Sequence, residues 1–338
     1  MSIEEGSSEA SPLLARNGDF LPRPNDRKSE VSGLAAMCFS SFFFSVMAIF
    51  VKYSAQTFPS MEIVFIRSII QFVLAVTMCR YFQVPIFGER GLRWALFIRG
   101  LFGAVGLAMN YYALTQLYLA DATVLFFISP VLTAVLARIF LKEPYGMFES
   151  IACLLCTIGL LLIGKPSFLF GQNIPDSTDI DAEKRLWATG ASLLGATMSS
   201  ISVVMLRQMG KTAHFMTHVV YFGGSSILFS GFFTFFITTS SSIPNNFISW
   251  AVLLVIGVTA FIGQSMQNKG VQLAPAGPIM LMRNFDIVFA FTFGILLFNE
   301  VPDGVSIIGT LLIIGGTLTM GVGKWFGFSK PVDNSRHS

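Results

Sequence analysis

An internal repeat constrains this chain more than any other feature. The block from Gln116 to Pro144 returns in altered form from Gln272 to Pro302, about 157 positions later. Three aligned pairs fix the register, with one inserted residue after the first: Gln116/Gln272, Val131/Val288 and Glu143/Glu300. A retained block of about thirty residues predicts that the chain folds as two copies of one structural unit.

The two copies differ at two positions inside the repeated apolar run. Phe126 and Ser129 of the first copy are replaced by Arg283 and Asp286 in the second. The similarity therefore predicts the fold, and the difference predicts where a site lies.

Composition places the chain in a lipid bilayer. Of its 338 residues, 53% are hydrophobic and 12% are charged, and the mean hydropathy is +0.68. These values exclude an ordinary soluble globular protein. Ten apolar runs approach the ~20 residues that cross a bilayer: about 31–53, 60–82, 94–116, 121–141, 147–164, 188–207, 214–238, 249–270, 276–298 and 304–323.

These runs predict an all-α polytopic membrane protein with ten transmembrane helices. Backbone amides in lipid need internal partners, and the runs are too continuous for the strands of a barrel. Each copy has five spans, an odd number, so the second copy enters the membrane from the opposite side. We expect two inverted five-helix repeats, an architecture characteristic of secondary transporters.

This topology predicts five regions along the chain. They are a disordered cytosolic tail (1–29), a first repeat (30–164), an external or luminal loop (165–187), a second repeat (188–325) and a cytosolic C-terminal tail (326–338).

Basic residues predict the orientation. With the N-terminus inside, four Lys or Arg lie outside: Lys52, Lys165, Lys184 and Arg185. Fourteen lie inside: Arg16, Arg23, Arg27, Lys28, Arg80, Arg90, Arg93, Lys142, Arg207, Lys211, Lys269, Lys324, Lys330 and Arg336. This asymmetry predicts that both termini are cytosolic. We expect the protein in the plasma membrane or in an endomembrane such as the ER, endosome or lysosome. The net charge of +3 comes from these loops and does not indicate nucleic-acid binding.

The N-terminal tail contains one short sorting pattern. Glu9, followed after three residues by Leu13 and Leu14, matches the acidic dileucine pattern that sorting adaptors read on cytosolic tails. Such a short pattern also arises by chance, so an unused tail is the alternative.

Four ionisable residues lie in the spans away from their ends, where charges are costly and usually face a cavity or one another. Arg67 is about 12 Å deep in the second span, and Arg99 is about 8 Å deep in the third. Arg283 and Asp286 lie in the ninth span, with Asp286 near the midplane. Three cations and one anion suit an anionic substrate, because a guanidinium pairs bidentately with carboxylate or phosphate.

Each of these residues also has a structural alternative. Arg283 and Asp286 are three residues apart and could pair with each other. Arg99 is shallow enough to extend toward the headgroups. Arg67 could be structural, although its nearest acid in sequence, Glu62, is poorly placed to pair with it.

The third span adds uncharged polar groups. Asn110, Tyr111 and Tyr112 would need partners if buried, and we expect them to line the substrate path. The alternative is an aromatic belt at the external interface.

Pro130 should kink the fourth span. We expect Lys52, Arg138 and Arg207 to be interfacial anchors.

The sequence contains no arrangement that predicts catalysis or metal binding. His214 and His218 share a helical face but lack a third ligand, and no nucleophile–base pattern is present. We expect no cofactor, no metal and no enzymatic activity.

The ten spans, the inverted repeats and the E-P or E-x-P that ends spans four and nine resemble the drug/metabolite transporter superfamily with its EamA domains. From about 33 to 325 the chain is similar to solute carrier family 35, subfamily G. The similar segments are Arg99-Gly100, Tyr111-Tyr112-Ala113, LADATV (119–124), Ser129-Pro130-Val131, Leu141-Lys142-Glu143, PSFLFG (166–171), LRQMGK (206–211), Ala276-Gly277-Pro278 and DIVFAF (286–291).

The resemblance implies solute transport by alternating access, and a member of this subfamily is associated with movement of citrate or related carboxylates. We therefore expect a transporter of a small organic anion, with a proton or chloride as a possible coupling ion. Two alternatives stay open. One is a transporter of another metabolite, such as a nucleotide sugar, an amino acid or a drug-like solute. The other is a non-transporting membrane regulator that acts through its cytosolic tail.

Overall fold

The computed structural model describes residues 27–55, 57–117, 125–143, 147–164, 182–236, 246–298 and 304–326. These residues form helices joined by turns. The helices are α1 (Arg27–Ser54), α2 (Ser60–Tyr81), η2 (Arg90–Leu92), α3 (Arg93–Gln116), α5 (Ser129–Phe140), α6 (Met147–Gly164), α8 (Ala182–Met209), α9 (Phe215–Phe236), α10 (Phe247–Leu273), α11 (Ala276–Met282), α12 (Phe285–Phe298) and α13 (Gly304–Phe326).

The helices confirm the predicted fold class. Within the described residues, each predicted span corresponds to one continuous helix or to helical segments separated by a short turn. Six of the helices in the described ranges are long and apolar enough to cross a membrane. Three shorter apolar helices accompany them: 129–140, 150–163 and 304–319. The sorting pattern at Glu9, Leu13 and Leu14 lies outside the described residues, as does most of the 165–187 loop.

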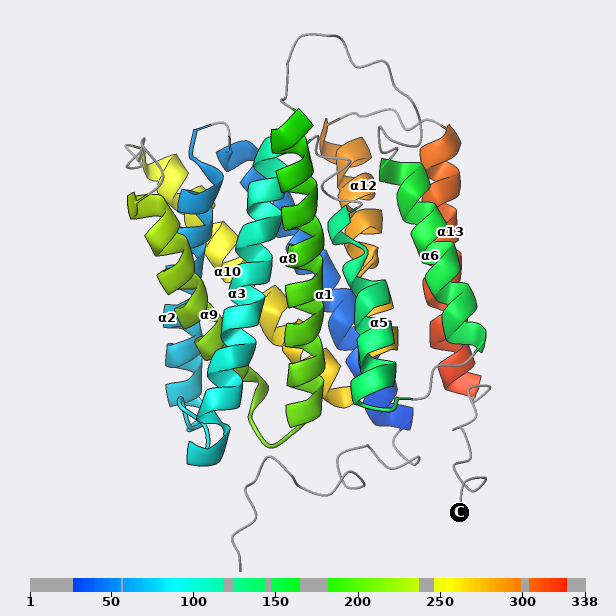
Figure 1. Cartoon of the computed structure of the whole chain (residues 1–338), viewed down its shortest axis with the longest axis horizontal. Helices are drawn as coiled ribbons and strands as arrows, with labels where there is room; N and C mark the ends of the chain where they lie inside the picture. Colours follow the sequence, from blue (N-terminus) through cyan, green and yellow to red (C-terminus); the bar gives the residue numbers. More distant parts are fainter. Residues whose placement is uncertain are drawn as a thin grey trace, which may run out of the picture.

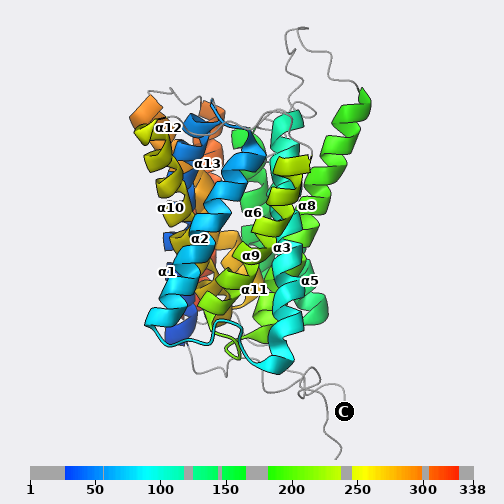
Figure 2. The ribbon, with the colours of Figure 1, turned by 90° about the vertical axis from the view of Figure 1, so that its left-hand side faces the viewer.

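The helices form one upright bundle in which the two copies interlock (Figure 1). The first helix of each copy packs on the third helix of the other, as α1 on α10 and α8 on α3. Equivalent helices also pair directly, as α2 with α9 and α6 with α13. Figure 2 shows α2, α9 and α3 as neighbours on one side of the bundle. Exchanging the two copies therefore leaves the packing pattern unchanged, as an inverted repeat requires.

Glycines allow the closest of these helix contacts. Gly33 of α1 meets Gly270 of α10, and Gly106 of α3 meets Gly195 of α8. Small residues let helix backbones approach, and this packing replaces the hydrophobic driving force that lipid removes. The same device joins α6 to α13, where Gly159 lies against the backbone of Gly309.

Replacing Gly159 by alanine is expected to destabilise the α6–α13 pair. Its added Cβ would lie 2.5 Å from the carbonyl oxygen of Gly309. We expect the free energy of unfolding to fall by about 1–3 kcal/mol. Gly315→Ala is the control, because its Cβ meets nothing within 4 Å. That change should be neutral or stabilising by about 0.5–1 kcal/mol. Equal shifts of the thermal unfolding midpoint in detergent would contradict this account.

The fourth and ninth spans are both broken at aligned positions. In the first copy, residues 127 and 128 form a turn, and Pro130 lies in the first turn of α5. In the second copy, Arg283 and Asn284 separate α11 from α12. A proline thus marks the first break, whereas no proline marks the second.

Equivalent serines of the two copies hold these breaks. The Ser200 hydroxyl donates to the Ser129 carbonyl at 3.0 Å, and the Ser45 hydroxyl donates to the Asp286 carbonyl at 2.7 Å. These bonds tie the start of each second half-helix, α5 and α12, to the first helix of the other copy.

Arg207 corrects one expectation. It is not an interfacial anchor, because it is 7% exposed and its Nε lies 2.8 Å from Oε1 of buried Glu143. Its Nη1 donates to the carbonyl oxygens of Val271 and Gln272, and the Ala276 N–H donates to Glu143 Oε2 at 2.9 Å. The connection between α10 and α11 therefore covers the end of α8. Of the other expected anchors, both Lys52 and Arg138 are exposed.

Candidate functional site

The break in the ninth span presents a charged pair. Nε of Arg283 lies 3.6 Å from Oδ2 of Asp286, too far for a good hydrogen bond but within ion-pair range. The guanidinium also lies over the rings of Phe44 and Phe126, 5.8 Å from each centroid. Among the described residues, Arg283 Nε and Asp286 Oδ1 are buried without hydrogen-bond partners. The two residues do pair, as one alternative expected, but the pair leaves hydrogen-bonding capacity unused.

Asn284 is a polar residue of this break that the sequence analysis missed. Its side chain is 4% exposed, and its Oδ1 has no hydrogen-bond partner among the described residues. Its position between Arg283 and Asp286 was the available signal, because a carboxamide inside an apolar run needs partners just as a charge does.

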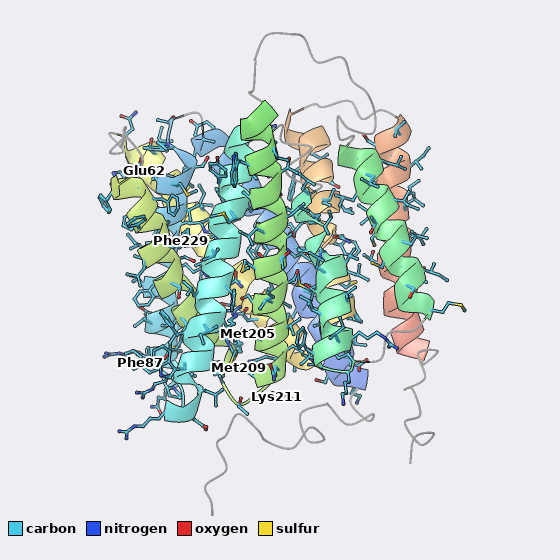
Figure 3. All side chains as sticks on the ribbon, in the orientation of Figure 1. Glu62, Phe87, Met205, Met209, Lys211 and Phe229 are labelled. Carbon is cyan, nitrogen blue, oxygen red and sulfur yellow. The ribbon has the colours of Figure 1, made fainter. Side chains whose placement is uncertain are left out.

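Arg67 is the least satisfied of the buried cations. Its side chain is 3% exposed, and its Nη1 points at the sulfur of Met47, a weak acceptor, at 3.6 Å. Nε has no partner, and no carboxylate of the described residues lies within ion-pair distance of Arg67. Glu62, the nearest acid in sequence, lies near the upper end of the bundle (Figure 3).

One face of α1 brings Arg67 and Arg283 into the same region. Met47, which contacts Arg67, lies three residues after Phe44, which contacts Arg283. Residues three apart on a helix share a face. The two guanidinium groups therefore approach neighbouring turns of α1 from opposite copies of the repeat.

Arg99 is bonded into the protein and does not extend toward the headgroups. Its Nη1 donates to the His218 carbonyl and its Nη2 to Asn268 Oδ1, each at 3.0 Å. Its guanidinium also lies over the Phe222 ring. Arg99 thus ties α3 to α9 and α10, with no partner for Nε in the part of the chain that the structure describes. His218 is fully buried, and neither of its ring nitrogens has a partner there. Neither His218 nor Asn268 was predicted as a site residue.

The polar residues near the end of α3 face in different directions. Tyr111 is 8% exposed, whereas Tyr112 is 39% exposed, as an aromatic belt would require. Asn110 has a buried Oδ1 without a partner. Asn110 and Tyr111 therefore belong to the interior together with the arginines, and Tyr112 lies apart from them.

His214 lies just outside the membrane-spanning part of α9. Burial lowers the pKa of its imidazole, and the positive charge of Lys269 lowers it further. The side chain is therefore neutral at pH 7. The described residues contain no group of three His, Cys, Asp or Glu side chains placed to hold a metal ion.

Comparison with known proteins decides the family. The model of the EamA-like transporter family matches residues 31–165 and again 186–322, once for each copy of the repeat. The chain belongs to the EamA-like transporter family. It is therefore a multi-pass integral membrane protein whose family moves small-molecule solutes across lipid bilayers.

Several relatives agree with this assignment. Solute carrier family 35 member G1 of Mus musculus is 33% identical over 298 residues, covering 88% of this chain and 80% of the relative. The pseudopaline exporter CntI of Pseudomonas aeruginosa is 29% identical, covering 84% of this chain and 93% of the relative. A solved crystal structure with 16% identity superposes with a TM-score of 0.73 over 87% of this chain and 98% of its own, which shows the shared fold.

Proposed function

We propose that this protein transports a small organic anion, of the di- or tricarboxylate class that includes citrate, by alternating access. The observation that carries the proposal is Arg67, a buried cation with one thioether contact and no carboxylate in ion-pair range among the described residues. Isolating a charge in a protein interior is costly unless something compensates it. A transported anion supplies that compensation.

Arg283 is the second cation of the proposed site. It lies in a helix break, and transporters use such discontinuous helices to place polar groups at the membrane midplane. Asp286 lies 3.6 Å from the Arg283 guanidinium, a weak contact. A substrate anion that replaces Asp286 there forms an ion pair with Arg283. Asn110, Tyr111 and Asn284 supply uncharged contacts, whereas the exposed Tyr112 lies apart from the proposed site.

Arg99 has a more structural part in this proposal. Its two Nη atoms are occupied by a carbonyl and a carboxamide, so its charge contributes to the positive potential more than to direct binding. Within the proposal both termini are cytosolic, a proton or chloride is the coupling ion, and a sorting adaptor reads the N-terminal tail.

Uptake of radiolabelled citrate into proteoliposomes tests the proposal. Wild type should take up citrate, and Arg67→Ala should lower uptake about 30-fold or more, because charge-assisted contacts to the substrate are lost. Arg138→Ala is the matched control, since Arg138 is exposed on α5. It should leave uptake unchanged.

Each negative result has its own meaning. No uptake of any carboxylate by the wild type would contradict the substrate class. Citrate uptake that survives Arg67→Ala would contradict the site while leaving the substrate class standing.

The internal bonding of Arg99 favours a second candidate, transport of another metabolite. One relative is named as a pseudopaline exporter. A thermal-shift screen against carboxylates, nucleotide sugars and amino acids separates the candidates, because a ligand that binds the folded state raises its apparent stability. Stabilisation by a non-carboxylate alone would favour the second candidate.

A further inference from the structure

Gln71 lies one helical turn from Arg67 on the same face of α2. Residues four apart on a helix lie one above the other, about 5–6 Å between Cβ atoms. Gln71 is fully buried, at 0% exposure. Its Nε2 and its Oε1 both lack hydrogen-bond partners among the described residues, as does Arg67 Nε beside it.

Three other polar residues of the bundle are hydrogen-bonded where Gln71 is not. Ser68, also on the buried face of α2, donates to the Val64 carbonyl at 2.6 Å. Gln264 donates to Asn268 Oδ1 at 3.2 Å, and Gln272 donates to the Ala213 carbonyl at 2.8 Å. Buried carboxamides in native proteins are normally hydrogen-bonded. A wholly buried carboxamide with neither atom partnered among the described residues, one helical turn from the partly unpartnered Arg67, indicates that a ligand is the missing partner.

The unmet groups define the chemistry of that ligand. Arg67 offers donors and suits a carboxylate. The Gln71 carboxamide offers a donor and an acceptor together. A second carboxylate would meet the donor but would leave Oε1 facing negative charge. A hydroxyl group satisfies both atoms, because it accepts from Nε2 and donates to Oε1.

We propose that Gln71 is a specificity-determining residue that binds a hydroxyl group of the transported anion, next to the carboxylate held by Arg67. The inference rests on the proposed function and names its substrate class as hydroxycarboxylates. Their analogues without the hydroxyl are disfavoured, because they leave the buried carboxamide unpaired.

A matched pair of probes tests this assignment. Malate and succinate carry the same two carboxylates and differ by one hydroxyl. In proteoliposomes, wild type should transport malate with a kcat/KM about 10-fold or more above that for succinate. In Gln71→Leu the ratio should fall to about 1, with succinate transport within about 3-fold of wild type. Gln208→Leu, on the exposed side of α8, should keep the wild-type ratio.

Stability provides a second readout. Leucine removes a polar group that has no partner, so Gln71→Leu should unfold at the same or a higher temperature than wild type without ligand. If the leucine variant fails to fold, the malate-to-succinate ratio is measured in Gln71→Met, which has an unbranched side chain. Misfolding of both variants overturns the assignment. A wild-type ratio near 1, or a variant that keeps the malate preference, also overturns it. If wild type transports neither anion, the proposed function fails as well.

Discussion

Arg283→Ala is expected to lower organic-anion uptake about 100-fold, which corresponds to the loss of a buried charge-assisted contact. The reason lies in the helix break, where Arg283 is held by a single acid at 3.6 Å and by two aromatic rings. Without the guanidinium, Asp286 also stays in the site as a buried acid that has lost the cation favouring its charged form. Uptake of citrate into proteoliposomes measures the effect.

Two further variants make the Arg283 result interpretable. Arg283→Lys keeps the charge but loses the bidentate fork, so it should retain part of the uptake. Arg283→Ala combined with Asp286→Ala removes the unpaired buried acid as well, and it should recover some of the activity that Arg283→Ala loses. Uptake in Arg283→Ala equal to that of wild type would exclude Arg283 from the site.

Glu143→Ala is expected to reduce the free energy of unfolding by about 3–5 kcal/mol, the largest stability effect that we predict. The carboxylate is the acid that compensates Arg207, and both side chains are buried. Its removal also leaves the Ala276 N–H without its acceptor. The unfolding midpoint of the purified protein in detergent checks this result.

The paired replacement separates the ion pair from simple loss of packing. Glu143→Met combined with Arg207→Met removes both charges, and it should recover most of the lost stability, because apolar replacement of a buried pair is often neutral. Arg138→Ala on the exposed side of α5 should change the midpoint little. A loss in Glu143→Ala no greater than in Arg138→Ala would show that the pair is dispensable.

The sequence predicts the structure best where hydropathy determines the positions of the helices. Apolar runs of about twenty residues can satisfy their backbones in lipid only as helices, so their positions were predictable. The break at Arg283 and Asn284 was not, because no proline marks it. Ser45, which donates a hydrogen bond to the Asp286 carbonyl after the break, lies 241 residues away in sequence.

The candidate site was predictable only in part, for a related reason. Charges such as Arg67 and Arg283 are conspicuous inside apolar runs, whereas amides such as Gln71 and Asn284 become informative only once their surroundings are known. Arg207 shows the opposite case. Its place at the end of a span indicated contact with water, but the connection from α10 to α11 folds over it and buries it.

The interlocking of the two copies has a consequence for biosynthesis. The main partner of α1 is α10, which begins 193 residues after α1 ends. At typical elongation rates of about 5–20 residues per second, the ribosome delivers that partner roughly 10–40 s later. During this interval α1 waits in the bilayer or beside the insertion machinery with its packing face, including Gly33, uncovered. The α1–α10 pairing is therefore completed only after most of the second copy has been synthesised.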